Sequence, residues 1–309
     1  MTKTSEQKPA DYIVPLLMNG LQGRMLHVPA PKNKNREILF IYGHHSSLER
    51  WWGVIQDLNQ YGAVTVPDLP GFGGMQSLYR IGEKPTVDTL ADYLAAFIKL
   101  KYKRRRITIA GLSFGFVVAT RMLQRYPDLV KKVDLLVSVA GFAHKDDFAF
   151  SKPRYLFYLS TARFFSMRLP AIFFRNIALH PLLLHTVYSK THNAKEKFKN
   201  LTPEQKKEMM NFEVHLWHCN DVRTYMKTSA EFLTVDNCKQ QVDLPVWHVS
   251  VEADQYFNNH MVEQHMRVIF TDFIEVKSSM DSHAPSIIAD KKTAAPLFPP
   301  KLRRKLNKN

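Results

Sequence analysis

Six short runs of β-branched and aromatic residues, several without polar alternation, constrain the fold of this chain more than any other feature. Strands of this kind are buried on both faces, as in a parallel sheet that helices cover. The runs are Ile38 to Tyr42, Ala63 to Val66, Ile107 to Ala110, Val133 to Val139, Val246 to Val251 and Phe273 to Val276. Helical patterns lie between them, which predicts right-handed strand–helix–strand units in a doubly wound, mostly parallel sheet.

Local signals define the elements around this sheet. Ile13 to Met18 and Gly23 to Val28 are predicted to form a hairpin that bends at Asn19-Gly20, a dipeptide suited to positive φ. Thr86 is a predicted N-cap, because apolar residues at helical spacing follow it. The helix after Ser113 is expected to stop before Pro127.

The strand pattern lapses between about Phe142 and Val242. This region is rich in aromatic and basic residues, and Thr202-Pro203-Glu204-Gln205 has the sequence of a helix-opening capping box. A structureless loop of that length would be unusual in a compact domain. We therefore predict a discontinuous α/β core of residues 1–142 and 243–309, with a helical cap over residues 143–242.

The N-terminal residues Met1 to Asp11 are polar, and no segment contains eighteen uncharged apolar residues in a row. Secretory signals and membrane-spanning helices need such apolar stretches. Cys219 and Cys238 are too few for a disulfide scaffold, which favours two thiols in a reducing compartment. The sequence predicts a cytoplasmic protein, with peripheral membrane contact left open.

Positive charge dominates the chain, with 43 basic and 28 acidic residues and a formal net charge of +15. Part of it is clustered in residues 101–106 and 301–305. Such clusters either form solvated faces or attract anionic lipid or nucleic acid. We expect a flexible basic tail over residues 291–309 that contacts anionic membrane peripherally, and no specific nucleic-acid partner.

The stretch RRRITIAGLSFGFVVATRMLQRYP, residues 104–127, puts Ser113 where a strand pattern meets a helical one. Gly111 and Gly115 flank it, and glycines permit the strained backbone and close strand–helix approach of a sharp turn. Such a turn can aim a serine outward as a nucleophile. The alternative is a small residue in a tight corner, and that interpretation requires the other catalytic groups to be absent.

Those groups are present in chain order, since Asp254 follows one buried strand and His283 follows the last. With the serine turn, ILFIYGHHSS and VPDLPGFGG, the chain resembles the α/β-hydrolase family over about residues 36–142 and 243–290. Four residues stand at that family's loop positions after the fourth strand: Asp68, Pro70, Gly71 and Gly73. The resemblance implies an α/β-hydrolase fold with an inserted helical cap.

The same resemblance assigns catalytic roles. Ser113 is the expected nucleophile, His283 the general base and then acid, and Asp254 the group that orients the imidazole. Other carboxylates stay open as the third member: Glu252, Asp146 and Asp147.

An oxyanion hole needs two backbone N–H donors, which the resemblance places at Phe114 and His44. Tyr42 stands where the family usually has histidine, so the packing of this loop is uncertain from sequence. Gly43, His45 and Phe142 are the expected substrate-binding residues. The His44-His45 pair is expected to line the pocket mouth.

No metal or cofactor is implied. His215 and His218 lie three apart on a predicted helix, but a metal site needs a further ligand. The apolar stretch of residues 153–185 carries four arginines and two helix-breaking prolines, which disfavours a membrane span. It indicates cap helices packed on the core and, compatibly with this, an apolar acyl pocket with arginines facing water or anionic head groups.

These features predict a serine hydrolase that cleaves a carboxylic ester of a hydrophobic acyl group through a covalent acyl-enzyme. Thioester, amide or carbon–carbon hydrolysis and acyl transfer remain open, because a triad does not fix the leaving group. Epoxide hydrolysis and dehalogenation in this fold use an aspartate at the turn, so Ser113 argues against them. The alternative is a non-catalytic binding protein of this fold on anionic membrane or nucleic acid.

Overall fold

The computed structural model describes residues 7–179, 202–280, 283 and 291–308. In those residues, one eight-stranded sheet has the order β1-β2-β4-β3-β5-β6-β7-β8. Strand β2 is antiparallel to β1 and β4, and every other pairing is parallel. The strands are β1 (Ile13–Met18), β2 (Leu21–Val28), β3 (Arg36–Ile41), β4 (Gly62–Pro67), β5 (Ile107–Leu112), β6 (Val133–Val139), β7 (Val242–Val251) and β8 (Phe270–Ser278). The predicted doubly wound α/β fold is confirmed.

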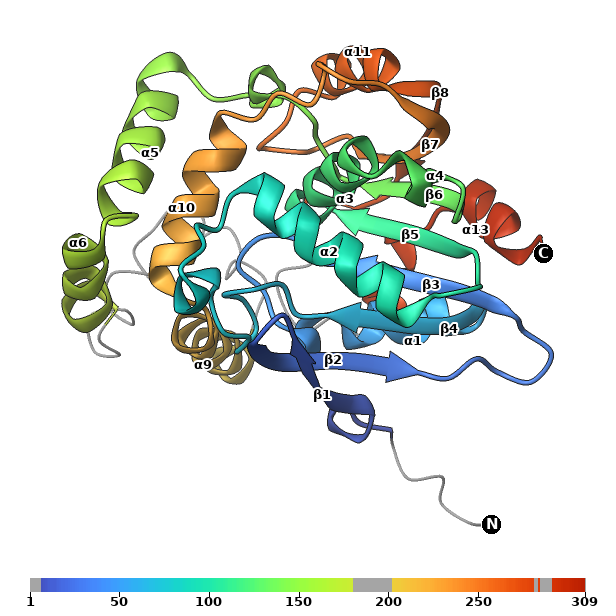
Figure 1. Ribbon diagram of the computed structural model, residues 1–309, viewed down its shortest axis with the longest axis horizontal. Helices are drawn as coiled ribbons and strands as arrows, with labels where there is room; N and C mark the ends of the chain where they lie inside the picture. The colour runs from blue at the N-terminus through green and yellow to red at the C-terminus, as the bar shows by residue number, and fades with distance from the viewer. Residues whose placement is uncertain (1–6, 180–201, 281–282, 284–290, 309) are drawn as a thin grey trace.

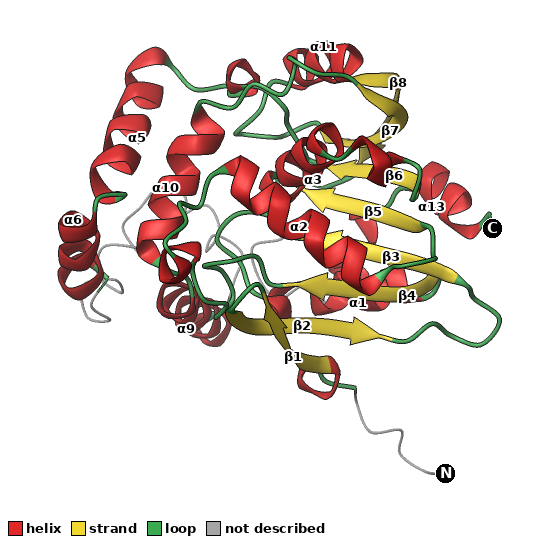
Figure 2. Ribbon diagram, viewed as in Figure 1, coloured by secondary structure: helices red, strands yellow, loops and turns green. Residues whose placement is uncertain are grey.

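Helices cover the sheet, with α2 and α3 on the face nearest the viewer and α1 behind it (Figure 1). Figure 2 separates these helical layers from the strands by colour. The helices of this core are α1 (Trp52–Asn59), α2 (Val87–Lys101), α3 (Phe114–Arg125), α4 (Pro127–Val130), α11 (Asn259–Ile269), α12 (Lys291–Ala294) and α13 (Pro300–Asn307). All residues of β4 and β5 are buried, as their apolar sequences predict.

The local signals act as expected. Asn19 and Gly20 have φ of 52° and 75°, which closes the β1–β2 hairpin. The Thr86 side chain accepts a hydrogen bond from the Thr89 N–H and caps α2. Strand β7 begins earlier than the apolar run suggested and includes Pro245. Because β6 pairs with β7 only from Val246 onward, this proline interrupts no pairing with β6.

Between β6 and β7 the described chain is mainly helical, with α5 (Lys152–Phe165), α6 (Arg168–Phe173), α9 (Pro203–Cys219) and α10 (Val222–Leu233). A π-helical turn, η5 (Phe174–Ala178), extends α6. Thr202 and Gln205 form the predicted capping box at the start of α9. The boundaries of the cap at residues 143 and 242 stay a prediction, and residues 180–185 of the apolar stretch lie outside the described residues.

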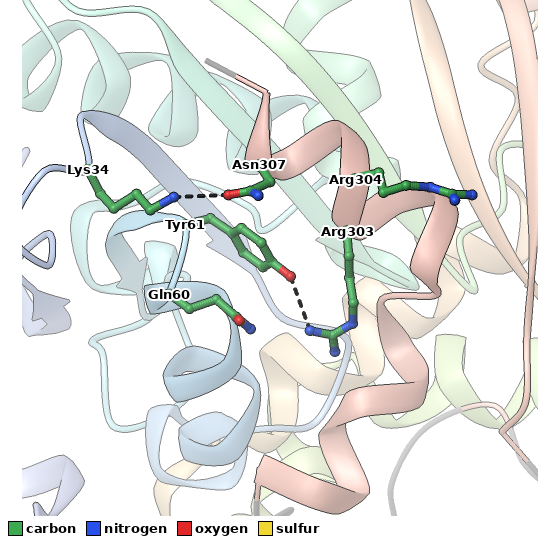
Figure 3. Close-up of a pocket in the computed structure, with 6 residues that line it drawn as sticks. All are labelled: Lys34, Gln60, Tyr61, Arg303, Arg304 and Asn307. Atoms are coloured by element: carbon green, nitrogen blue, oxygen red, sulfur yellow. Dashed lines mark hydrogen bonds between the residues drawn. The ribbon is translucent and has the colours of Figure 1, made fainter.

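The basic segment that was expected to be a flexible tail includes helix α13, which packs on the core. Helix α13 buries Leu302 and Leu306 to 0% and 2% exposure, so one turn of spacing gives it an apolar face. Arg303 of the same helix forms an ion pair of 2.6 Å with Asp57 of α1. Figure 3 shows Arg303 turned toward Tyr61, in a surface cavity of about 380 Å³.

Searching the described residues finds no helix with the length and apolar character needed to cross a membrane.

Candidate active site

Ser113 lies at a sharp turn between β5 and α3. Its φ of 49° and ψ of −120° are strained values for a residue with a side chain. A Cβ at Gly111 would lie 2.6 Å from the Phe116 Cα atom, and one at Gly115 would lie 2.3 Å from the Ile41 carbonyl oxygen. Both positions therefore require glycine, and together they bring α3 close enough to the sheet to hold the turn.

Asp254 and His283 meet in the structure. The Nδ1 atom of His283 lies 2.7 Å from Oδ2 of Asp254, and the two side chains are 13% and 3% exposed. The other oxygen of Asp254 accepts hydrogen bonds from the N–H groups of Tyr256 and Phe257, at 2.8 and 3.3 Å. A carboxylate only accepts, so Nδ1 carries the proton and the neutral imidazole keeps Nε2 as its basic nitrogen.

The three predicted catalytic residues follow β5, β7 and β8, whose parallel strands end at the same edge of the sheet. No hydrogen bond joins the Ser113 hydroxyl to His283 in the described part of the chain. Catalytic hydrogen bonds are often long before substrate binds. The Ser113–His283 contact stays a prediction.

Aromatic rings connect the surroundings of these residues. The ring of Phe257 lies 5.2 Å from that of His283 and stacks on Phe142 at 4.5 Å. Phe232 of the cap helix α10 lies 6.1 Å from Phe142 and 5.7 Å from Phe114, the residue after Ser113. An apolar wall thus extends from the histidine to the serine turn, and Phe142, an expected substrate-binding residue, is part of it.

The other carboxylates considered from sequence lie elsewhere. Asp147 is fully buried, and its Oδ1 is 2.5 Å from Nδ1 of His265. Asp146 faces His144, and Glu252 is exposed. Of the four candidates, Asp254 is the one that contacts His283.

The loop after β3 lies against the serine turn. A Cβ on Gly43 would be 3.3 Å from the Ser113 Cβ atom. Phe114 opens α3, so its N–H has no acceptor within the helix. The His44 ring packs 5.4 Å from the Phe114 ring. These positions suit the two predicted oxyanion donors, whose hydrogen bonds to a substrate stay a prediction.

The His44 side chain binds the cap. Its Nε2 atom lies 2.8 Å from the Thr228 hydroxyl of α10. Burial, with a smaller effect of neighbouring His45, holds the pKa of His44 well below its usual value. The ring is therefore neutral at pH 7, and its position fixes the loop that carries the expected N–H donor.

Tyr42 supports the same loop through its side chain, a role that was not predicted from the sequence. Its hydroxyl donates to Oδ1 of buried Asp68 at 2.6 Å, and Arg24 donates to Oδ2 at 3.3 Å. Burial raises the pKa of Asp68 to about 8, although Tyr42 and Arg24 both oppose that rise. Tyr42 thus joins the oxyanion loop to the loop after β4.

His45 also faces the cap, and its place at the pocket mouth stays a prediction. Its ring lies 4.2 Å from Trp217 of α9, and its Nδ1 is 3.3 Å from the Asn220 side chain. Asn220 in turn accepts a hydrogen bond of 2.7 Å from the N–H of Gly73. Among the described residues, histidine, cysteine and acidic side chains form no group of three that could hold a metal ion.

Comparison with known proteins agrees with the fold. The sequence profile of the alpha/beta hydrolase fold matches residues 37–217. Protein ABHD8 of Homo sapiens is 32% identical over 100 residues, which are 32% of this chain and 22% of that protein. The aligned region thus spans under a quarter of that relative.

Two of the many solved structures with this fold illustrate the likeness. A hydrolase from Oleispira antarctica has a TM-score of 0.66 at 11% identity and covers 92% of this chain and 94% of its own. A thermophilic esterase from Thermogutta terrifontis has a TM-score of 0.63 at 15% identity and covers 96% and 99%. At such identities the likeness concerns the fold alone.

Proposed function

Because the chain belongs to the alpha/beta hydrolase fold family, we propose that it is a serine hydrolase that cleaves carboxylic esters of hydrophobic acids. The observation that carries the proposal is the 2.7 Å hydrogen bond between His283 and Asp254 at the sheet edge where Ser113 occupies a strained turn. An oriented histidine with a basic Nε2 is the group that such a serine needs.

The first half-reaction forms an acyl-enzyme. The Ser113 oxygen attacks the ester carbonyl carbon while its proton passes to Nε2 of His283. Asp254 stabilises the imidazolium that results. The tetrahedral intermediate then breaks its bond to the leaving alcohol, which takes the proton back from Nε2.

The second half-reaction returns the enzyme to its starting state. Water gives a proton to Nε2 of His283 and attacks the acyl carbon, and Ser113 leaves with that proton. In both steps the negative oxygen would be stabilised by the N–H groups of Phe114 and His44. The contact of the His44 ring with Thr228 would keep the His44 N–H in place before the reaction begins.

The preference for an apolar acyl group is proposed from the aromatic wall beside the serine turn. Phe114, Phe142, Phe232 and Phe257 offer rings and no hydrogen-bonding groups, so they favour hydrocarbon over charged acyl chains. The thermophilic esterase found among the structural neighbours is consistent with ester chemistry on this fold.

A fluorophosphonate probe tests the nucleophile, since it reacts with activated serines. The wild-type protein should be labelled, and Ser113→Ala should not. Ser138→Ala is the matched control, because the Ser138 hydroxyl lies 2.9 Å from the histidine His248 but is fully buried. Labelling of this variant, measured per folded molecule, should equal that of the wild type.

Hydrolysis of p-nitrophenyl esters of increasing acyl length tests the substrate class. We expect kcat/KM to rise with acyl length until the apolar site is filled. Equal labelling of Ser113→Ala and wild type would overturn the proposal, and a wild type that takes no label would favour the non-catalytic binding protein. If kcat/KM falls steadily as the acyl chain becomes longer than acetyl, the apolar acyl site is refuted, but the assignment of Ser113 as nucleophile stands.

A further inference from the structure

The outer surface of α5, α6 and η5 is apolar and exposed. The inner side of these helices packs on α10 through Leu159, Ala162 and Ala171. Large apolar side chains on the outer side are 48% to 78% exposed: Leu156, Phe157, Phe164, Met167, Leu169, Ile172, Phe173 and Ile177. We call these eight residues the cap face. So dense a group of exposed apolar residues marks an interaction surface.

Part of the cap face forms a continuous apolar stripe along one side of α6 and η5 rather than a set of scattered residues. Leu169, Ile172, Phe173 and Ile177 recur at intervals of three and four residues along α6 and η5. Residues at this spacing lie on one side of a helix. The sequence interpretation of packed cap helices accounts for the buried side of each helix, and the cap face is the opposite, exposed side.

Exposed cations lie on the same helices as the cap face. Lys152, Arg154, Arg163, Arg168 and Arg175 are all exposed. The sequence contains no aspartate or glutamate between Asp147 and Glu196. Exposed apolar side chains mixed with positive charges and no negative ones match an anionic membrane surface, where the rings enter the lipid and the arginines meet phosphate groups.

The position of the cap face also fits a flat partner. Helices α5 and α6 lie at one end of the longest axis of the molecule, with α10 between them and the sheet (Figure 1). Helix α13 lies at the other end. Because Leu302 and Leu306 of α13 are buried, that helix offers cations to a membrane but no apolar side chains.

We propose that the cap face docks the protein on an anionic lipid bilayer, with the side chains of α5, α6 and η5 inserted at the level of the head groups. The binding does not depend on catalysis, so Ser113→Ala should bind vesicles as the wild type does. A second copy of the chain fits this surface less well, because two cap faces would bring like charges together.

Vesicle sedimentation tests the apolar contribution. Wild-type protein should bind vesicles of equimolar phosphatidylcholine and phosphatidylglycerol. The variant Phe157→Ser/Leu169→Ser/Phe173→Ser should lower the partition coefficient by about tenfold or more. These side chains are 66%, 78% and 62% exposed, so their replacement leaves the fold intact. The matched control is Leu17→Ser/Leu100→Ser, at 70% and 58% exposure outside the cap, and should change nothing.

A second pair of variants tests charge. Arg163→Gln/Arg168→Gln/Arg175→Gln should weaken binding by about tenfold or more on the same vesicles, and much less on phosphatidylcholine alone. Lys301→Gln/Arg304→Gln/Lys305→Gln removes the same charge from α13 and should leave binding unchanged. Equal losses in the two variants would mean adsorption by net charge and would overturn the proposal.

Two further results would also overturn it. One is vesicle binding by the serine variant of the cap face that equals wild type. The other is sedimentation equilibrium that shows a dimer in wild type and a monomer in the same variant, without any vesicle binding by either protein. That second outcome would assign the cap face to a second copy of the chain.

Discussion

The carboxylate of Asp147 lies 2.5 Å from Nδ1 of His265, in a second aspartate–histidine pair beside the candidate active site. The loops that carry the two pairs touch, because the N–H of Asn258 donates to the Asp147 carbonyl oxygen at 2.8 Å. His265 therefore occupies the carboxylate of Asp147, one of the residues that the sequence left open as alternatives to Asp254. The two pairs give a direct test of which aspartate serves catalysis.

Replacing Asp254 with asparagine should lower kcat for a p-nitrophenyl ester by about ten-thousandfold, because the amide no longer fixes the tautomer with a basic Nε2. Asp147→Asn is the matched control, and its kcat should stay within about tenfold of wild type. Steady-state rates and probe labelling measure both. A larger loss of kcat for Asp147→Asn than for Asp254→Asn would mean that Asp147, and not Asp254, is the catalytic carboxylate.

Sequence order was enough to place Ser113, Asp254 and His283 at one sheet edge, because strand ends follow from the alternation of apolar runs and helices. Sequence order could not decide which acidic residue contacts His283, since Asp147 and Asp254 both follow strands of the same sheet. What separates them is which histidine each one meets, and that depends on how α11 packs against the sheet. Contacts of this kind leave no local pattern.

The contacts that hold the oxyanion loop in place could not be predicted from the sequence for the same reason. Thr228 is 184 residues from His44 along the chain, and Asp68 is 26 residues from Tyr42. No turn or helix rule links either pair. One signal was available, because tyrosine in place of the family's histidine implied a different partner for that side chain.

The cap face was partly visible in the sequence as an arginine-bearing apolar stretch. Which side of its helices is exposed could not be predicted without knowing how they pack on α10.

Thr228→Val should reduce turnover through the loop rather than through the triad. The Thr228 hydroxyl donates to the Thr224 carbonyl and accepts from His44, so valine leaves a buried N–H without its partner. The free energy of unfolding should fall by about 1–3 kcal/mol. Displacement of the donor loop should lower kcat between about tenfold and a hundredfold.

Thr234→Val provides the comparison at the C-terminal end of the same helix. The Thr234 hydroxyl also donates to the carbonyl four residues earlier, at 2.9 Å, but has no contact with the loop after β3. Its kcat should equal that of wild type. An unchanged kcat in Thr228→Val, measured where both proteins are fully folded, would remove His44 from the oxyanion site.

Buried His248 should make stability depend on pH. Burial lowers its pKa to about 4, and its Nδ1 lies 2.9 Å from the Ser138 hydroxyl. The unfolded chain takes up this proton below a pKa near 6.5, whereas the folded protein does so only near 4. Its contribution is therefore complete above pH 6.5 and is lost as pH falls toward 4.

At pH 5 the loss from this one group is about 2 kcal/mol relative to pH 7. His248→Asn keeps an acceptor for the Ser138 hydroxyl but cannot titrate. In urea unfolding, the free energy of unfolding of the variant should change between pH 7 and pH 5 by about 2 kcal/mol less than that of the wild type. The same pH dependence in both proteins would mean that the folded protein protonates His248 as readily as the unfolded chain.

Helix α13 should stabilise the core rather than fray from it. Leu302 is 0% exposed and Arg303 pairs with Asp57 of α1, so both hold the C-terminal segment against the sheet domain. Leu302→Ala should lower the free energy of unfolding by about 2–5 kcal/mol, through lost apolar burial and the cavity that remains. Lys305→Ala, an exposed position on the same helix, should change it by about 0.5 kcal/mol or less. Because a flexible tail would make the two variants equally stable, urea titration of both separates a docked helix from a frayed one.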